Sequence, residues 1–293
     1  MKRKNLFLRC CVIALILFVY SCTKKPDNVV TSADGVRVSF TQMGKGTLAI
    51  VFVHGWANRA SIWDETMSHF SGKYQTVAVD LYGSDESYNN RKAWSMAMFG
   101  EDVAAVVKKL KLNQVVLVGF SMGGAVIAET AKLLPDKITG LVLVDNLQDV
   151  EMKYAPEMVA AMDSVLMDLV SAPTNEKFVN GGFYKENQEK AFQRVETMLK
   201  SSSRTGWKRS LQSYFRWINE DCIESFKKIK APVTAINSDM EPTKVETFRK
   251  YAPSFQAKII PDVAHLVFWD NPEEFNRLLE ESIQEFVNKS KLE

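Results

Sequence analysis

The chain has 293 residues, of which 46% are hydrophobic and 25% are charged. This balance is typical of a globular protein and leaves room for one large α/β domain with an insertion. Lysine and arginine number 37 against 35 aspartate and glutamate, so the formal net charge is +2. Such a charge gives no electrostatic support for binding nucleic acid or a polyanionic substrate, and function has to be sought in particular motifs.

The first 22 residues indicate an export signal. Residues 1–5 are basic, and residues 6–20 are apolar except for Arg9, which is too short for a comfortable membrane span but suits a secretory hydrophobic region. The segment ending at Cys22 resembles a bacterial lipoprotein signal. That resemblance implies acylation of Cys22 and a lipid anchor on a bacterial membrane, with the folded part facing the periplasm or the outside. An uncleaved signal anchor is the alternative, and residues 23–28 form a polar tether.

The use of cysteine agrees with export. Cys10 and Cys11 would leave with the signal and Cys22 would carry lipid, so the mature domain keeps only Cys222. No disulfide is then possible within the domain. With no histidine near it in the sequence, Cys222 is interpreted as a packing residue.

The core is predicted to begin with a hairpin, residues 29–30 paired with residues 36–40 and turned at Asp34-Gly35. Short apolar runs then recur at wide spacing, at residues 48–53, 76–79, 115–118, 141–144, 233–236 and 258–260. Continuous apolar runs separated by helical patterns predict strands buried on both faces of a mostly parallel, doubly wound sheet.

Helical periodicity covers residues 97–110 and 272–289, which are expected to flank the sheet. The sixth and seventh strands are separated by about eighty-five residues without a clear strand pattern, a much longer interval than between the other strands. This segment contains helical runs at 157–169, 186–200 and 205–219. An excursion of this size is too long for a loop. We therefore expect two core segments, 29–146 and 231–293, with a helical cap at 147–230 over the carboxyl edge of the sheet.

A serine lies between two glycines where an apolar strand meets a helix, in Gly119-Phe120-Ser121-Met122-Gly123. This G-x-S-x-G pattern is a nucleophile elbow, in which the serine is expected at positive φ with its hydroxyl exposed at the carboxyl end of the sheet. Met122 would be the first residue of the following helix, and its backbone amide would face an oxyanion.

With this elbow, the chain resembles the α/β-hydrolase family from about residue 29 to residue 286. His54-Gly55-Trp56 after the third strand is similar to the family's H-G turn. The resemblance implies a backbone role for His54 and an oxyanion hole formed by the amides of Trp56 and Met122. It implies no metal and no organic cofactor.

A serine hydroxyl needs an imidazole to accept its proton. The chain has three histidines; His69 falls in a predicted helix, and His54 belongs to the H-G turn. His265 follows the last strand and precedes the last helix, where the chain order serine, acid, histidine places the base.

The triad acid is open among three carboxylates. Asp239 and Glu241 follow the strand at 233–236, and both fit the family's acid position. Asp239 is preferred because aspartate is the commoner choice and lies directly at the strand end. Asp145, after the preceding strand, is the third candidate, since some family members use that position.

The cap is rich in large apolar side chains, some of which are expected to line an apolar substrate pocket: Met152, Met158, Met162, Met167, Phe178, Phe183, Tyr184, Phe192, Met198, Trp207, Tyr214, Phe215 and Trp217. We therefore expect a serine hydrolase that cleaves a carboxylic ester or related acyl bond of small to medium apolar acyl groups through an acyl-Ser121 intermediate. The alternatives are C–C or amide hydrolysis or perhydrolysis on the same triad, or a non-catalytic ligand sensor on the same fold.

Overall fold

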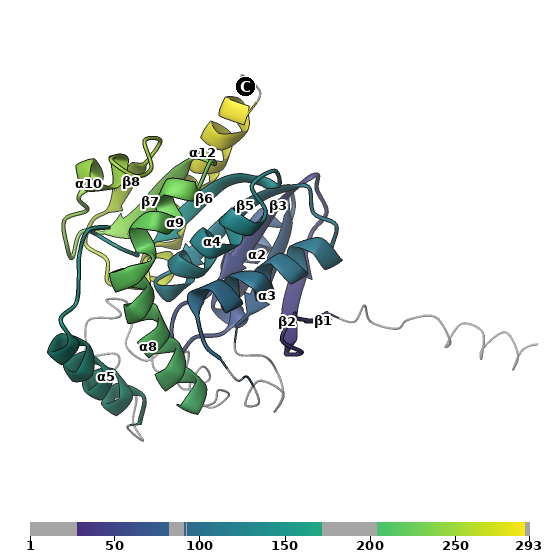
Figure 1. Ribbon diagram of the computed structural model, residues 1–293. Helices are drawn as coiled ribbons and strands as arrows, with labels where there is room; N and C mark the ends of the chain where they lie inside the picture. The colour runs from purple at the N-terminus through teal and green to yellow at the C-terminus, as the bar shows by residue number, and fades with distance from the viewer. Residues whose placement is uncertain (1–27, 82–90, 92, 172–203, 291–293) are drawn as a thin grey trace, which may run out of the picture.

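The computed structural model describes residues 28–81, 91, 93–171 and 204–290 (Figure 1). The predicted export signal, most of the tether and the helical run at 186–200 lie outside the described residues. Among the described residues, no helix combines the length and the apolar character that crossing a bilayer requires.

An eight-stranded sheet forms the centre of the molecule, in the order β1-β2-β4-β3-β5-β6-β7-β8. The strands are β1 Val29–Thr31, β2 Arg37–Met43, β3 Leu48–Val53, β4 Gln75–Asp80, β5 Gln114–Phe120, β6 Ile138–Val144, β7 Val233–Ser238 and β8 Gln256–Ile260. β2 pairs antiparallel with β1 and β4, and every other pair is parallel. The predicted amino-terminal hairpin and the mostly parallel sheet are both confirmed.

Helices cover both faces of this sheet. The described helical segments are η1 Ala60–Trp63, α2 Asp64–Phe70, α3 Met96–Lys109, α4 Met122–Leu133, α5 Pro156–Ser171, α8 Arg204–Glu220, α9 Cys222–Lys228, α10 Val245–Arg249, α11 Val267–Asp270 and α12 Pro272–Ser290. α3 packs on α4 at one face, and α12 packs on α2 at the other (Figure 1).

The central strands are buried along their length. All residues of β3 are buried, and only the first residue of β5 and the second residue of β6 are not. Burying an aliphatic side chain contributes about 1.5–3 kcal/mol, so these runs make the sheet a rigid frame. Because the parallel strands run in one direction, the loops after β3, β5, β6, β7 and β8 emerge at one edge.

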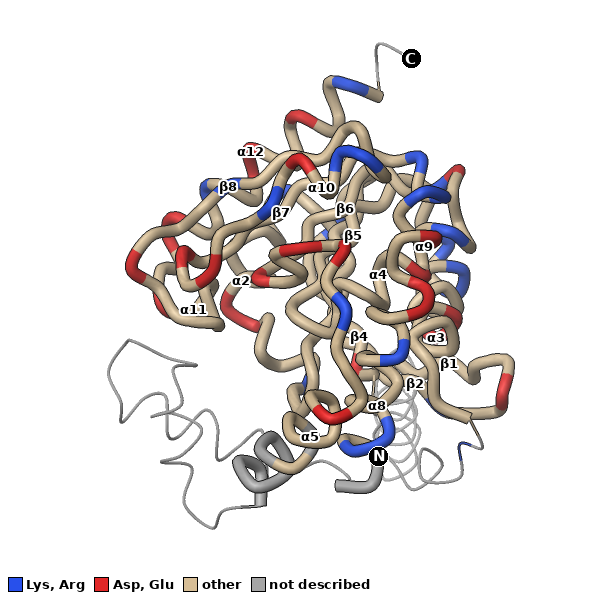
Figure 2. The backbone as a smooth tube through the Cα atoms, turned by 60° about the vertical axis from the view of Figure 1, so that its left-hand side comes forward, with Lys and Arg blue, Asp and Glu red and all other residues tan. Residues whose placement is uncertain are grey.

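The insertion between β6 and β7 contains α5, α8 and α9, as the change of spacing predicted. α8 is tied to the core through Trp217, whose indole N–H donates to Glu129 on α4 at 2.8 Å. Figure 1 shows α5 and the amino-terminal part of α8 together at one end of the molecule. Charged residues of both signs are spread around the surface (Figure 2), in keeping with the small net charge.

Candidate active site

Ser121 lies in a sharp turn between β5 and α4, with φ of 50°. The predicted positive φ is therefore confirmed. A Cβ atom at Gly119 would lie 2.4 Å from the carbonyl oxygen of Gly123, and one at Gly123 would lie 2.5 Å from the carbonyl oxygen of Val53. Only glycine allows the strand and the helix to approach this closely. The turn thus depends on both glycines of the motif.

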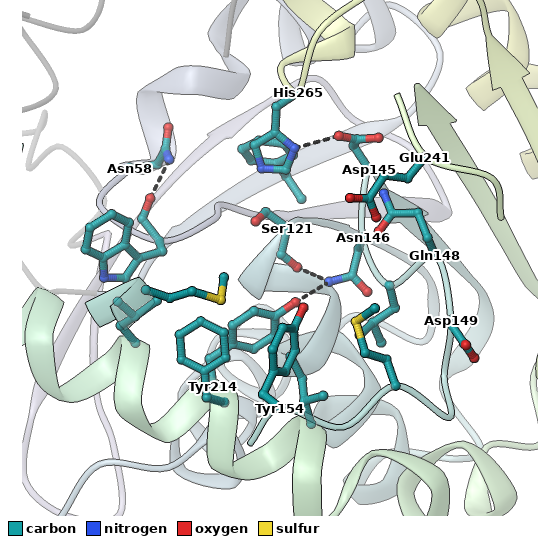
Figure 3. A pocket seen from close by; sticks show the side chains of 18 of the residues that line it. Asn58, Ser121, Asp145, Asn146, Gln148, Asp149, Tyr154, Tyr214, Glu241 and His265 are labelled. Carbon is teal, nitrogen blue, oxygen red and sulfur yellow. Dashed lines mark hydrogen bonds and ion pairs between the residues drawn. The ribbon is translucent and has the colours of Figure 1, made fainter. Parts of the chain in front are cut away.

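His265 and Asp145 meet beside this serine (Figure 3). Nδ1 of His265 lies 2.5 Å from Oδ2 of Asp145. The other oxygen of Asp145, Oδ1, accepts hydrogen bonds from the amide and the hydroxyl of Ser238, each at 2.8 Å. A carboxylate accepts and cannot donate, so Nδ1 carries the proton and Nε2 of a neutral ring is left to accept one.

The acid position preferred from the sequence needs correction. Asp239 is exposed, and its Oδ1 accepts a hydrogen bond from the amide of Asp262 at 3.2 Å. Successive side chains of a strand point to opposite sides, and Ser238 at the end of β7 points toward Asp145. Asp239 therefore points away from His265. Glu241 reaches the same pocket but does not contact the imidazole.

The two other histidines lie where the sequence placed them. His54 is buried; its Nε2 accepts from the amide of Leu81 at 3.0 Å, and its Nδ1 lies 2.8 Å from the carbonyl oxygen of Gly55. With one nitrogen accepting, the ring is neutral and holds the H-G turn against the end of β4. His69 is exposed on α2.

Trp56 lines the same cavity as Ser121, and Met122 follows Ser121 as the first residue of α4. In the described part of the chain, neither residue's backbone amide donates a hydrogen bond to a protein acceptor. The turn that carries Trp56 is fixed by its side chains, because the indole N–H of Trp56 donates to the carbonyl of Trp207 at 2.7 Å, and Asn58 donates to the carbonyl of Trp56 at 2.7 Å. Both amides are thus available to an oxyanion beside Ser121.

A cavity of about 260 Å³ opens above Ser121 and His265. Its cap wall is mainly apolar, as expected from the sequence, although Gln148 and Asp149 also line it. The large side chains of this wall are Met152, Tyr154, Met162, Leu211, Tyr214, Phe215 and Ile218. Trp207 and Trp217, which belong to the same apolar set, are buried in the core. Ligand pockets usually span 300–1,000 Å³, so this cavity suits a small ligand.

Asn146 is a site residue that the sequence analysis did not identify. Its Nδ2 donates to the carbonyl oxygen of Ser121 and to the hydroxyl of Tyr214 on α8, the latter at 3.2 Å (Figure 3). Because a carbonyl only accepts, the amide group must face the serine, which leaves the buried Oδ1 of Asn146 without a partner among the described residues. Asn146 therefore links the turn at Ser121, the loop that begins with Asp145 and the cap helix α8. The signal in the sequence was an Asp-Asn pair directly after a buried strand, a pair that tolerates left-handed backbone.

Positive φ angles, in the left-handed region of the backbone, occur at other residues near Ser121 as well. Asp145 has φ of 40°, Leu147 has 39° and Ala57 has 56°. Together with Ser121, these residues follow three neighbouring strands, β3, β5 and β6. Non-glycine residues in this region are uncommon and gather where the surrounding structure holds them for function.

The remaining chemistry-bearing residues lie apart from this site. Burial raises the pKa of the Cys222 thiol to about 12, so the thiol stays protonated at neutral pH. Cys222 is fully buried in the core, which confirms its interpretation as a packing residue. No group of three or more His, Cys, Asp and Glu side chains suited to a metal ion occurs within the ranges that the structure describes.

Comparisons with known proteins agree with this geometry. Residues 49–272 match the family described as having the alpha/beta hydrolase fold, and the chain belongs to that family. A protein of Bacillus subtilis (strain 168) named as a 2-succinyl-6-hydroxy-2,4-cyclohexadiene-1-carboxylate synthase is 23% identical, covering 86% of this chain and 96% of its own. The pimeloyl-[acyl-carrier protein] methyl ester esterase of Wigglesworthia glossinidia brevipalpis is 24% identical, covering 83% of this chain and 96% of its own.

The solved structure of a thermophilic esterase from Thermogutta terrifontis, with malate bound, has the same fold, with a TM-score of 0.72. It is 20% identical to this chain and covers 88% of this chain and 98% of its own. Family and site together define the protein as a hydrolase of the α/β-hydrolase fold. One of the relatives is named as a synthase, so the bond that is cleaved has to be argued from the site.

Proposed function

We propose that the protein hydrolyses carboxylic esters through an acyl-Ser121 intermediate. Oγ of Ser121 attacks the ester carbonyl carbon while Nε2 of His265 takes the hydroxyl proton. The C–O bond then breaks, and His265 returns the proton to the leaving alcohol. In the second half, His265 accepts a proton from water, the hydroxide attacks the acyl carbon, and a carboxylic acid leaves as Ser121 regains its proton.

The observation that carries this proposal is the Asp145–His265 pair beside the strained Ser121. Asp145 fixes the tautomer in which Nε2 accepts, and its charge stabilises the imidazolium that forms in the transition state. The amides of Trp56 and Met122 would stabilise the oxyanion, since they have no protein acceptor in the described part of the chain. The relative from Wigglesworthia is an ester hydrolase by name, which favours an ester over the other acyl bonds.

The cavity limits the substrate. Each buried methylene contributes about 0.8 kcal/mol, so kcat/KM on p-nitrophenyl esters should rise over the first few acyl carbons. It should then fall once the acyl chain exceeds a cavity of about 260 Å³. A rise that continues to long-chain esters would show an open groove and contradict a closed, small pocket.

The test of the mechanism combines labelling with two substitutions. A fluorophosphonate probe should label the wild-type protein, and Ser121→Ala should abolish the label. Ser121→Ala and His265→Ala should each remove nearly all ester hydrolysis, leaving the roughly 10³- to 10⁴-fold acceleration over water that binding and the oxyanion hole supply. A variant that folds and keeps most of its activity would remove that residue from the mechanism. A protein that binds esters tightly without turnover or labelling would be a sensor.

The amino-terminal anchor is a second part of the proposal. The basic start, the apolar stretch and Cys22 support acylation of Cys22 and attachment to a bacterial membrane. Metabolic labelling with a fatty-acid analogue should mark the wild type and not Cys22→Ala. Label on Cys22→Ala, or a mature terminus elsewhere, would contradict acylation at this cysteine.

A further inference from the structure

The two carboxylates that follow β7 have different environments. Asp239 turns outward to the amide of Asp262, whereas Glu241 lines the cavity with Ser121 and His265 (Figure 3). The proposed mechanism needs only one carboxylate, and Asp145 fills that role. Glu241 is thus a charged group of the cavity to which the chemistry assigns no task.

The charge of Glu241 is not balanced by neighbouring side chains. Asp149, another carboxylate of the cavity wall, pairs with Lys244 at 2.9 Å and accepts from Thr247 at 3.2 Å. In contrast, Glu241 forms no ion pair or hydrogen bond with any described residue. The described cavity wall also contains no lysine or arginine. The described residues of the cavity wall therefore present a net negative charge to a ligand.

Two phenol rings line the same cavity. Tyr154 and Tyr214 lie on its cap side (Figure 3). The pKa of Tyr154 is raised, first by burial and then by the negative charge of Glu241. Aromatic faces and an unpaired carboxylate are the groups that bind an ammonium ion in proteins, the first through cation–π contact and the second through charge.

We propose that Glu241 makes this site selective for esters that carry a positive charge, such as an alkylammonium group, over neutral esters of the same shape. The inference rests on the proposed ester hydrolysis and adds a substrate class to it. A negatively charged ester would be disfavoured at the same place. Since Glu241 is exposed to solvent at the rim of the cavity, the attraction is screened, and we expect an effect of about three- to tenfold rather than an absolute requirement.

The experiment compares pairs of esters that differ in charge and not in shape. Acetylcholine and 3,3-dimethylbutyl acetate differ in charge on the alcohol side. The p-nitrophenyl esters of trimethylammonioacetate and 3,3-dimethylbutyrate differ in charge on the acyl side. For each pair, the ratio of kcat/KM for the cationic to the neutral ester is measured in the wild type, in Glu241→Gln and in Asp239→Asn. Comparing proteins cancels the intrinsic reactivity of each ester.

The matched control is Asp239→Asn, which removes the same charge from the same loop outside the cavity. Glu241→Gln should lower the ratio about three- to tenfold in at least one pair, and added salt should shrink that difference. Asp239→Asn should leave both ratios within twofold of the wild type. Equal ratios in all three proteins, or equal losses in the two variants, would overturn the role of Glu241 while ester hydrolysis stands. Failure of the wild type to turn over any of these esters would overturn the proposed function and this inference with it.

Discussion

The loops after β6 and β7 begin side by side at the same edge of the sheet, and both carry carboxylates, yet only the first contacts the histidine. Asp145 after β6 is 4% exposed and has two donors from Ser238 in addition to His265. Asp239 after β7 is exposed and accepts one backbone amide. A carboxylate that supports catalysis must be buried, oriented and satisfied by hydrogen bonds, and strand position alone does not provide this.

The two loops are also joined to each other. The amide of Asn146 donates to Oδ1 of Asn237 at 3.4 Å, and Nδ2 of Asn237 donates to the hydroxyl of Thr243 at 2.8 Å. The end of β7 therefore holds the loop after β6 in place, through an acceptor on Asn237 and two donors on Ser238. In the proposed mechanism the acid, Asp145, follows β6, and the residues that hold it in place lie at the end of β7. Substitutions can test these two roles separately.

The largest effect is expected for Asp145→Asn. An amide at this position cannot hold the imidazole in the tautomer that accepts from Ser121, so kcat should fall about 10³- to 10⁴-fold with little change in KM. Steady-state kinetics on a short-chain p-nitrophenyl ester measure this. Asp239→Asn, as the control, should stay within about twofold of the wild type. A large loss in Asp239→Asn with a mild one in Asp145→Asn would mean that Asp239, and not Asp145, is the acid.

A smaller effect is expected for Asn146→Asp, which keeps the shape of the side chain. One carboxylate oxygen would then face the carbonyl of Ser121, and the repulsion should displace the nucleophile turn. An unsatisfied buried group costs about 1–3 kcal/mol, so we expect kcat/KM to fall about 10- to 100-fold. Tyr214→Phe removes only the contact with the cap and should cost a few-fold. Similar small losses in both variants would mean that Asn146 supports the cap and not the serine.

The smallest effect is expected for Ser238→Ala. This variant removes one of the two donors to Oδ1 of Asp145 and leaves the amide of residue 238 in place. A hydrogen bond to a carboxylate contributes about 1–3 kcal/mol, and the remaining amide should limit the drop in kcat to about two- to tenfold. The midpoint of urea unfolding should fall modestly. An unchanged kcat would show that the backbone amide alone orients the acid.

The sequence was sufficient for the frame of the site. Apolar runs located β3 to β7, because strands that are buried on both faces show a continuous apolar run and no alternation with polar residues. A short run at 258–260 located the partly exposed edge strand β8, and the G-x-S-x-G pattern located Ser121. The chain order then led to His265. These features depend on residues close to one another along the chain.

The carboxylate that contacts His265 could not be chosen in the same way. Asp145 and Asp239 follow neighbouring strands that end at one edge, and their sequence contexts do not show which side chain turns inward. That choice depends on Ser238, which is separated from Asp145 by the whole cap. Likewise, the apolar pattern of the cap did not distinguish Tyr214, which lines the cavity, from Trp217, which is buried and donates a hydrogen bond to Glu129.

The left-handed residues at this edge have a consequence for stability. Each such residue costs about 1–3 kcal/mol of folding free energy, and Ala57, Ser121, Asp145 and Leu147 lie in loops that follow the neighbouring strands β3, β5 and β6. Relaxing them would favour the folded state and disturb the catalytic geometry at the same time. A search for thermostable variants should therefore leave these loops alone and turn to the outer helices. The free energy gained by burying the strands offsets this strain, and it therefore limits how many strained residues the site can contain before the protein unfolds.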